Sequence, residues 1–395
     1  NGSIMTDYNF LQSYTFKNGA VINNRIVFAP TTLRSSFEEG SISPIEEDYY
    51  KMRAGGPGLL ISEVAYVIDS QKGFEGQIGA ANENHLVSLK KLAVAMKSGG
   101  QKAVLQIFAA GSRSNTRILR GKPLLSASDI PTYKSDEIPQ EMTEKEIQDT
   151  IQAFGDATRL AIEAGFDGVE IHGANLYLIQ QFLSPATNHR KDNWGGDFNH
   201  RINFPLSVLS EVLITRHENP DFLVGYRLSP EEPFEDGLRI EETIEFAKIL
   251  ADSGIDYLHL SLQQFDQSPF KSPEITRPIV ALFKAALPSD VPLITVGMVR
   301  RPKDAQAAIG IGADFVALGR QLIAEPNWVQ KVENGEEEAI RYAMSKSDYE
   351  LLKISPSLSS WLETRFKRGF VYVGDPGFNA QEPWKILRDE KGKLI

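Results

Sequence analysis

Residues 163–173 read Glu-Ala-Gly-Phe-Asp-Gly-Val-Glu-Ile-His-Gly, and they join the end of a predicted helix to a short predicted strand. Gly165 permits the left-handed backbone conformation that closes many helices. The apolar run from Gly168 to Gly173 has the length of a strand. The same order of helix, glycine and short apolar run recurs around Gly254 and Gly312. Repeated helix-to-strand joints of this kind are typical of α/β proteins.

Eight such runs alternate with helical patterns along the chain. They are rich in Val, Ile, Leu and Phe without strict alternation, as expected of parallel strands buried on both faces. Eight strands in this order predict a closed (β/α)₈ TIM barrel. An open doubly wound sheet also alternates and stays an alternative, although the first strand lacks the G-x-G-x-x-G fingerprint of such sheets. The predicted strands are 25–30, 59–67, 102–108, 168–173, 223–229, 257–262, 292–297 and 315–320, and the predicted helices are 83–97, 143–164, 199–216, 240–252, 273–287 and 302–310.

Local signals fix two further elements. Thr143 and Glu146 stand three residues apart at the start of a helical pattern, which predicts a capping box. Asn18-Gly19 lies between two β-prone runs. This dipeptide predicts a hairpin ahead of the barrel, with positive φ at both central turn positions.

We expect a single domain over residues 1–395, with the barrel core at about 25–325 and an extension at about 326–395. The extension is predicted to be helical to about residue 362 and is then aromatic and glycine-rich. Two long polar stretches, 109–142 and 174–199, follow strand ends, and loops of that length usually carry function. The native start is left open between Asn1 and Met5.

The composition excludes several classes of protein. The 395 residues include no cysteine, which removes disulfides, cysteine-ligated zinc, iron–sulfur clusters and thiol nucleophiles. The formal net charge of −10 argues against nucleic acid or an anionic membrane as partner. No run is long and apolar enough to span a bilayer, and no signal segment opens the chain. We therefore expect a cytoplasmic protein with a small-molecule partner and no metal site, and we leave a homo-oligomer open.

The most informative grouping is His172-x-x-Asn175-x-Tyr177 at the end of a predicted strand. An imidazole and a carboxamide can both donate to one oxygen atom, and a phenol can supply a proton. This set suits a reaction that builds negative charge on a carbonyl oxygen. A single histidine at a strand end is more often structural, but the grouping is far less common by chance.

Two polar side chains lie inside apolar strands. Gln106 needs hydrogen-bond partners if it is buried, and either an amide-like ligand edge or the backbone would supply them. Arg227 is costly without a counter-charge. It can bind an electron-rich ligand, or it can pair with a barrel carboxylate such as Glu170.

The last two predicted strands end in Val296-Gly297-Met298 and Leu318-Gly319-Arg320. TIM barrels commonly bind phosphate at this position. Glycine lets the backbone approach an anion, and Arg320 can chelate it. The two ends together predict a phosphate site.

These motifs, with Arg25-Ile26-Val27-Phe28-Ala29-Pro30-Thr31-Thr32 and Gln180-Gln181-Phe182-Leu183-Ser184-Pro185, resemble the old yellow enzyme family of FMN-dependent, single-barrel ene-reductases. The resemblance runs from about residue 8 to 330. It implies that Pro30 and Thr31 touch the flavin ring, that Thr32 bonds flavin O4, and that Ala65 packs near the pyrimidine. It also implies that the flavin or its phosphate is bound by Gln106, Arg227, Gly297, Met298, Gly319 and Arg320.

The resemblance implies tightly bound, non-covalent FMN and a ping-pong cycle with NADH or NADPH as reductant. Hydride would pass through flavin N5 to an α,β-unsaturated carbonyl-type acceptor. His172 and Asn175 would bind the carbonyl oxygen, and Tyr177 would donate the proton. Two alternatives stay open, a phosphate-binding TIM-barrel lyase or isomerase and a non-catalytic flavin-binding protein. Some longer relatives carry an iron–sulfur cluster, which a chain without cysteine cannot hold.

Overall fold

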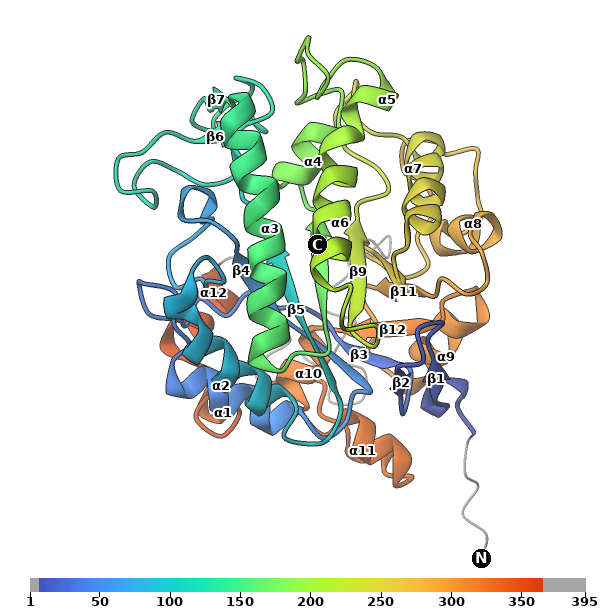
Figure 1. Cartoon of the computed structure of the whole chain (residues 1–395). Coiled ribbons are helices and arrows are strands. Elements are labelled where there is room, and N and C mark those ends of the chain that lie inside the picture. The colour runs from blue at the N-terminus through green and yellow to red at the C-terminus, as the bar shows by residue number, and fades with distance from the viewer. Residues whose placement is uncertain (1–6, 365–395) are drawn as a thin grey trace, which may run out of the picture.

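The computed structural model describes residues 7–364, and its centre is a closed barrel of eight parallel strands (Figure 1). Each strand lies within one of the predicted runs, so the TIM barrel is confirmed and the open sheet is excluded. The strands, in order around the barrel, are β3 (Ile26–Phe28), β4 (Leu59–Tyr66), β5 (Lys102–Phe108), β8 (Gly168–Gly173), β9 (Leu223–Leu228), β10 (Tyr257–Leu260), β11 (Leu293–Val296) and β12 (Phe315–Leu318). The expectations for residues 1–4 and for the glycine-rich tail lie outside the described residues.

Helices cover the outside of the barrel, and Figure 1 shows α3 and α6 side by side across the strands. Within residues 7–364, no helix combines the length and the apolarity that crossing a bilayer requires. The covering helices are α1 (Pro44–Arg53), α2 (Leu86–Met96), α3 (Glu144–Ala164), α6 (Asn203–Thr215), α7 (Ile240–Ser253), α8 (Ile279–Ala286) and α9 (Pro302–Gly310).

Two helix predictions need correction, and one helix was not predicted. The segment 199–216 is two helices, α5 (Phe198–Arg201) and α6, which meet at Ile202. The segment 273–287 is helical only from Ile279, because the residue before a proline is disfavoured in a helix and Pro278 therefore delays the start. Helix α1 was not predicted, although Ser43, Pro44 and Glu46 form a recognisable start signal with a capping box.

The start and end of α3 agree with the sequence signals. The Thr143 hydroxyl accepts a hydrogen bond from the Glu146 backbone N–H at 3.2 Å, and the Glu146 carboxylate accepts one from the Thr143 N–H at 2.9 Å. Gly165 closes the helix at φ 97°, and Gly254 closes α7 at φ 111°. Both left-handed helix ends are therefore confirmed.

The N-terminal hairpin pairs β1 (Tyr14–Thr15) with β2 (Val21–Ile22). Only Gly19 has positive φ, 93°, so the predicted two-residue turn is wrong. The Gly19 N–H donates to the Phe16 carbonyl, and the Phe16 N–H donates to the Ala20 carbonyl. These two bonds form a longer hairpin loop that ends in a left-handed glycine. The ring of Phe16 packs 5.5 Å from that of Phe315, so the hairpin closes the N-terminal end of the barrel.

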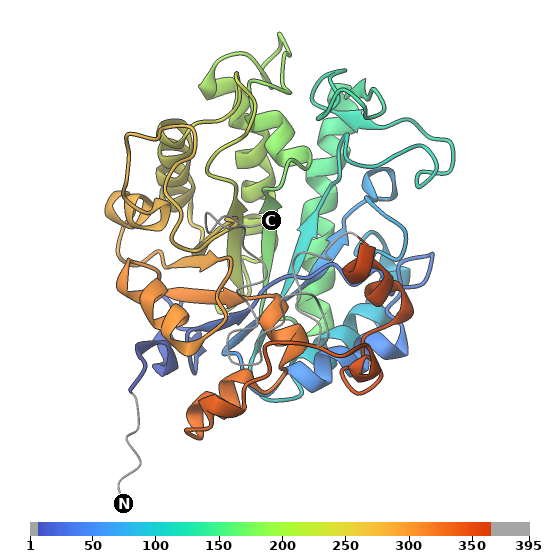
Figure 2. The same ribbon diagram turned by 180° about the vertical axis from the view of Figure 1, so that it is seen from behind.

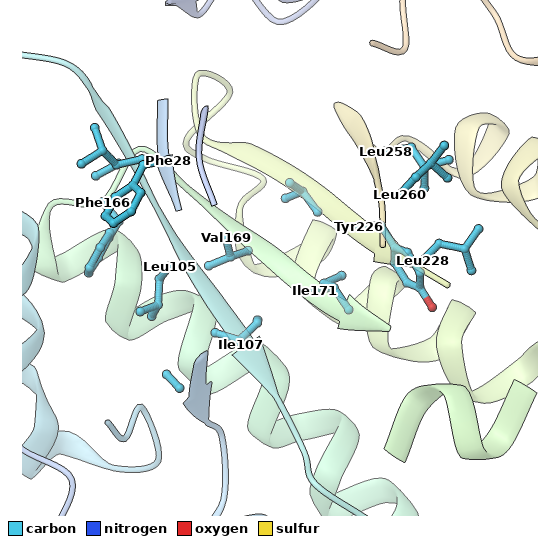
Figure 3. Close-up of a cluster of buried hydrophobic side chains, with 14 of the residues drawn as sticks. Phe28, Leu105, Ile107, Phe166, Val169, Ile171, Tyr226, Leu228, Leu258 and Leu260 are labelled. Carbon is cyan, nitrogen blue, oxygen red and sulfur yellow. The ribbon is translucent and has the colours of Figure 1, made fainter. Parts of the chain in front are cut away.

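Alternation along the strands separates an outer face, which packs against the helices, from the residues that face the barrel interior. Figure 3 shows Leu105 and Ile107 on β5 and Val169 and Ile171 on β8, which belong to the large core cluster against the helices. The residues between them on each strand therefore face the barrel axis.

The extension after the barrel is helical only in short pieces, so the expectation of a helical tail to about 362 is wrong in detail. Pro326, Gly335 and Pro356 interrupt it. Arg53 donates to the carbonyls of Leu322, Ile323 and Leu352, which ties the extension to α1, and Figure 2 shows the red segment beside the blue one. The pieces are α10 (Arg320–Ala324), α11 (Trp328–Glu333), η4 (Glu337–Ala339), η5 (Lys346–Asp348) and α12 (Pro356–Thr364).

Candidate active site

A cavity of about 1230 Å³ opens at the carboxyl ends of the barrel strands. It exceeds the roughly 300–1,000 Å³ of an ordinary ligand pocket and has room for a cofactor together with a substrate. With the exception of Ala65, the predicted site residues all line it, although they come from six different strands and their loops. They are Pro30, Thr31, Thr32, Gln106, His172, Asn175, Tyr177, Arg227, Gly297, Met298, Gly319 and Arg320.

Ala65 does not line the cavity. Leu59 and Ile61 on β4 face the barrel interior, and strict alternation would place Ala65 on the same face. The pairing with β5 is irregular between Ile61 and Val64, however, and a bulge there shifts the facing by one residue. Ala65 therefore packs in the outer core, and Val64 takes the position at the cavity wall.

The turn after β8 has an unusual backbone. Asn175 and Leu176 both have positive φ, 57° and 66°, a conformation that is rare for residues other than glycine and that clusters at functional sites. The Leu176 N–H donates to the side chain of Gln180 at 3.0 Å, and its carbonyl accepts from Gln181 at 2.7 Å. The paired glutamines quoted above thus hold the turn that carries the candidate catalytic residues.

His172 and Asn175 present two donors side by side. Nδ1 of His172 accepts from the Ala174 backbone N–H at 3.3 Å, so the proton of the neutral ring is on Nε2. Oδ1 of Asn175 accepts from the Ser261 hydroxyl at 2.6 Å, which leaves the amide Nδ2 3.5 Å from Nε2 of His172. Ser261 directly follows β10 and lies far along the chain from the His172-x-x-Asn175-x-Tyr177 motif, so nothing in the sequence indicated its role.

The environment keeps the His172 ring neutral. Burial lowers the pKa of His172 well below its usual value of 6.5, and the nearby positive charge of Arg227 lowers it further. A neutral imidazole can donate from Nε2 without bringing a charge into the cavity.

Tyr177 lies at the edge of an aromatic group. Its ring centre is 4.7 Å from that of Phe108 and 5.2 Å from that of His172. The guanidinium of Arg113 lies 5.0 Å from the Tyr177 ring centre and donates to the Asn175 carbonyl at 2.7 Å. Arg113 comes from the long 109–142 loop, whose residues gave no recognisable pattern, and the sequence analysis did not identify it.

Arg227 is not paired with Glu170. Among residues 7–364, its buried Nε has no hydrogen-bond partner and no carboxylate forms an ion pair with it. The Glu170 carboxylate instead accepts from Gln106 Nε2 at 2.9 Å. Two alternatives left open by the sequence, a backbone partner for the Gln106 side chain and an Arg227–Glu170 ion pair, are thus absent from the described part of the chain. A half-buried guanidinium whose buried Nε donor is unused fits an electron-rich ligand edge such as that of a flavin.

The other end of the cavity suits an anion. Gly297 has φ 114°, and a Cβ there would lie 2.5 Å from the Gln263 carbonyl oxygen, so only glycine fits. Arg320 lies behind it, with Nη1 3.3 Å from the Met298 sulfur, and burial lowers the pKa of its guanidinium. Arg300, which the sequence analysis missed, also lines this end. Backbone and guanidinium donors together fit a phosphate group.

The segment 188–196 supports the loops around the cavity. Arg190 is buried and donates to the carbonyls of Ala127 and Met142 at 2.9 and 2.8 Å, and Asp192 binds its guanidinium at 2.7 Å. These contacts tie the segment to the long loop that carries Arg113 at two points, Ala127 in its middle and Met142 at its end.

Three comparisons place these features among known proteins. Residues 11–339 match the model of the NADH:flavin oxidoreductase / NADH oxidase family. A protein of Bacillus subtilis described as a probable NADH-dependent flavin oxidoreductase is 42% identical over 341 residues, 86% of this chain and 91% of that protein. An NADH:acrylate oxidoreductase of Vibrio harveyi is 40% identical over 81% of this chain, which spans only 33% of that longer protein. The structure of an old yellow enzyme homologue from Zymomonas mobilis is alike in fold, with a TM-score of 0.71 and 24% identity over 83% of this chain and 93% of that one.

Proposed function

This chain belongs to the NADH:flavin oxidoreductase / NADH oxidase family, that of the old yellow enzymes, and we propose that it reduces the activated C=C bond of α,β-unsaturated carbonyl-type acceptors. It is an NAD(P)H-dependent flavin oxidoreductase that uses FMN. The proposed cycle is ping-pong, with reductant and acceptor using the same cavity in turn. The acrylate-reducing relative supports a conjugated C=C bond as the reacting group.

One observation carries the proposal. Nε2 of His172 and Nδ2 of Asn175 are two hydrogen-bond donors 3.5 Å apart, and they line the same cavity as the half-buried cation Arg227. Two fixed donors stabilise the negative charge that develops on a carbonyl oxygen when hydride adds to a conjugated double bond. We assign that role to His172 and Asn175.

The cavity residues divide between two parts of the cofactor. Gln106, Arg227 and the Pro30–Thr32 loop would hold the flavin ring, and Gly297, Met298, Gly319 and Arg320 would hold the phosphate. FMN supplies hydride transfer at N5 once it is bound. The positive charge of Arg227 favours acceptance of hydride, and Val64 replaces Ala65 in the proposed contact with the ring.

Tyr177 is proposed as the proton donor to the α-carbon. Tyr177 lines the cavity two residues after Asn175, and the packing against Phe108 fixes its ring. General acids act within hydrogen-bond reach of the atom they protonate. A non-catalytic flavin-binding protein would have no use for a phenol beside the two donors, and a lyase would leave Arg227 without a ligand.

Colour and its loss test the proposal. Purified protein should absorb at about 450 nm, as expected of an oxidised flavin, and NADH or NADPH should bleach it without oxygen. An enone such as 2-cyclohexenone should then restore the colour. Bleaching without recovery on any of several enones and unsaturated acids would rule out C=C reduction and leave the flavin-binding alternative.

We further propose that residues 1–395 form one domain, and size measurement in solution would show whether it self-associates.

A further inference from the structure

A buried polar cluster lies inside the barrel directly below the cavity. The Glu170 carboxylate accepts hydrogen bonds from Gln106 Nε2 at 2.9 Å, from the Tyr257 hydroxyl at 2.8 Å and from His259 Nδ1 at 3.1 Å. All four side chains are buried, and they come from β5, β8 and β10. A buried carboxylate with three donors is a built feature of the barrel, because β5 supplies one donor and β10 supplies two from the other side of β8.

The barrel contains a specific adaptation for this cluster. Strand β9 lies between β8 and β10, and in the strand register Gly225 stands between Glu170 and Tyr257. A Cβ on Gly225 would lie 2.0 Å from the Tyr257 ring, so the tyrosine can cross β9 only because this residue is glycine. The hydroxyl thereby reaches Glu170 two strands away.

Glu170 remains a carboxylate in this position. Burial acts to raise its pKa, but His259, Arg227 and the hydrogen bond from Gln106 outweigh burial and bring the pKa to about 2. An ionised carboxylate only accepts hydrogen bonds. The amide nitrogen of Gln106 must therefore face Glu170, and its carbonyl oxygen is turned away from the carboxylate.

The charge of Glu170 also acts on Arg227. The two residues lie on neighbouring strands and face the same interior, with Arg227 two positions beyond the register partner of Glu170. No ion pair within 4 Å joins them in the described residues, yet each affects the charge state of the other. Glu170 thus offsets part of the positive potential that Arg227 directs into the cavity, while leaving the guanidinium free to bind a ligand.

We infer that Glu170 is a positioning residue for the flavin, which orients the Gln106 amide and sets how strongly Arg227 favours reduction of the cofactor. The inference rests on the proposed placement of the flavin ring against Gln106 and Arg227. Removal of the negative charge would strengthen the field of Arg227 and stabilise the negative charge that reduction places on FMN.

The test compares the midpoint potential of bound FMN in four proteins: wild type, Glu170→Gln, Tyr257→Phe and Glu232→Gln. In Glu170→Gln the new amide can still accept from Gln106, so mainly the charge is lost. We expect the equilibrium constant for two-electron reduction to rise at least tenfold, which corresponds to a potential ~30 mV higher. In Tyr257→Phe the carboxylate keeps its charge and loses a donor, so the potential should fall.

Glu232→Gln is the matched control. Glu232 is also a buried carboxylate, which accepts from Gln180 at 2.8 Å and from the Leu238 N–H at 2.9 Å, but it is not among the charges that act on Arg227. The midpoint potential of FMN bound to the Glu232→Gln variant should equal that of the wild type. General disturbance of the barrel would shift Glu170→Gln and Tyr257→Phe in the same direction.

The outcomes separate the two proposals. The role of Glu170 is overturned if the potential is equal in wild type, Glu170→Gln and Tyr257→Phe, or if it shifts in the same direction in both variants. Neither result would affect FMN binding or enone reduction by the wild type. If Glu170→Gln does not fold, the Tyr257→Phe variant decides: a lower potential supports the role of Glu170, and an unchanged or higher potential overturns it. A wild-type protein that binds FMN with the same affinity and potential after Arg227→Leu would instead refute the proposed placement of the flavin.

Discussion

The Nδ1 atom of His172 accepts a hydrogen bond from the backbone N–H of Ala174 at 3.3 Å, and this contact determines which ring nitrogen carries the proton. With Nδ1 occupied by a donor, Nε2–H is directed to the side of the ring where Asn175 lies. The chain itself thus sets the tautomer that a carbonyl acceptor requires.

Replacement of His172 by alanine should lower kcat/KM for an enone about 10²–10³-fold, the usual cost of one lost donor to a developing oxyanion. The rate of flavin reduction by NADH should change much less if the donor pair serves mainly the acceptor. Stopped-flow measurement of the two half-reactions checks this, and an equal loss in both would contradict the assignment.

Replacement of Ser261 by alanine should slow reduction of the acceptor, although Ser261 is not proposed to contact the acceptor itself. The Ser261 hydroxyl holds Oδ1 of Asn175 at 2.6 Å, so its loss frees the amide to rotate. We expect a roughly fivefold lower kcat/KM for enones, in line with the ~1 kcal/mol of a typical hydrogen bond. Ser261→Thr, which keeps the hydroxyl, should retain most of the activity; if it loses as much as the alanine variant, orientation of Asn175 is not the cause.

Replacement of Tyr177 by phenylalanine should slow reoxidation of the flavin by an enone far more than its reduction by NAD(P)H. The ring and its contact with Phe108 remain, and only the proton donor is lost. Rapid mixing of the pre-reduced enzyme with enone measures the effect. Unchanged reoxidation would show that another group, or water, supplies the proton.

Stability should fall as the pH drops below about 6.5. Burial lowers the pKa of His172 and of His259, so the unfolded chain takes up protons near pH 6.5 that the folded chain does not. This part of the stability is fully present above the unfolded-state pKa and is lost as the pH falls toward the folded-state values. Urea denaturation between pH 7.5 and 5.5 should show a weaker pH dependence in His172→Gln than in wild type, and an equal pH dependence in the two proteins would contradict the contribution of His172.

Truncation of Trp361 to alanine should widen the range of acceptors. Trp361 on α12 lines the cavity beyond the family match at residues 11–339, and its ring stacks 4.3 Å from the Arg34 guanidinium. We expect kcat/KM for a bulky enone to rise relative to that for 2-cyclohexenone, with Trp361→Phe in between. A parallel loss for both acceptors would mean that α12 only supports the fold.

Some of the site could be predicted from the sequence because its signals are local. The strands are short apolar runs between helices, and their limits depend on glycine, proline and periodicity within a few residues. His172, Asn175 and Tyr177 lie within a six-residue span at the end of one strand, so their joint position at the cavity follows once the strand is identified.

The remainder depends on contacts between distant strands. Val64 lines the cavity in place of Ala65 because the pairing between β4 and β5 is irregular. The sequence of one strand alone cannot reveal such an irregularity. Glu170 and His259 are 89 residues apart, and their contact exists only because the closed barrel places β8 and β10 on either side of Gly225. The sequence by itself determined the barrel and the donor motif through local periodicity and spacing. Tertiary structure alone decided which polar groups inside the barrel satisfy each other and which, like Arg227, are left for a ligand, because hydrogen bonding of buried groups depends on partners that only barrel closure brings together.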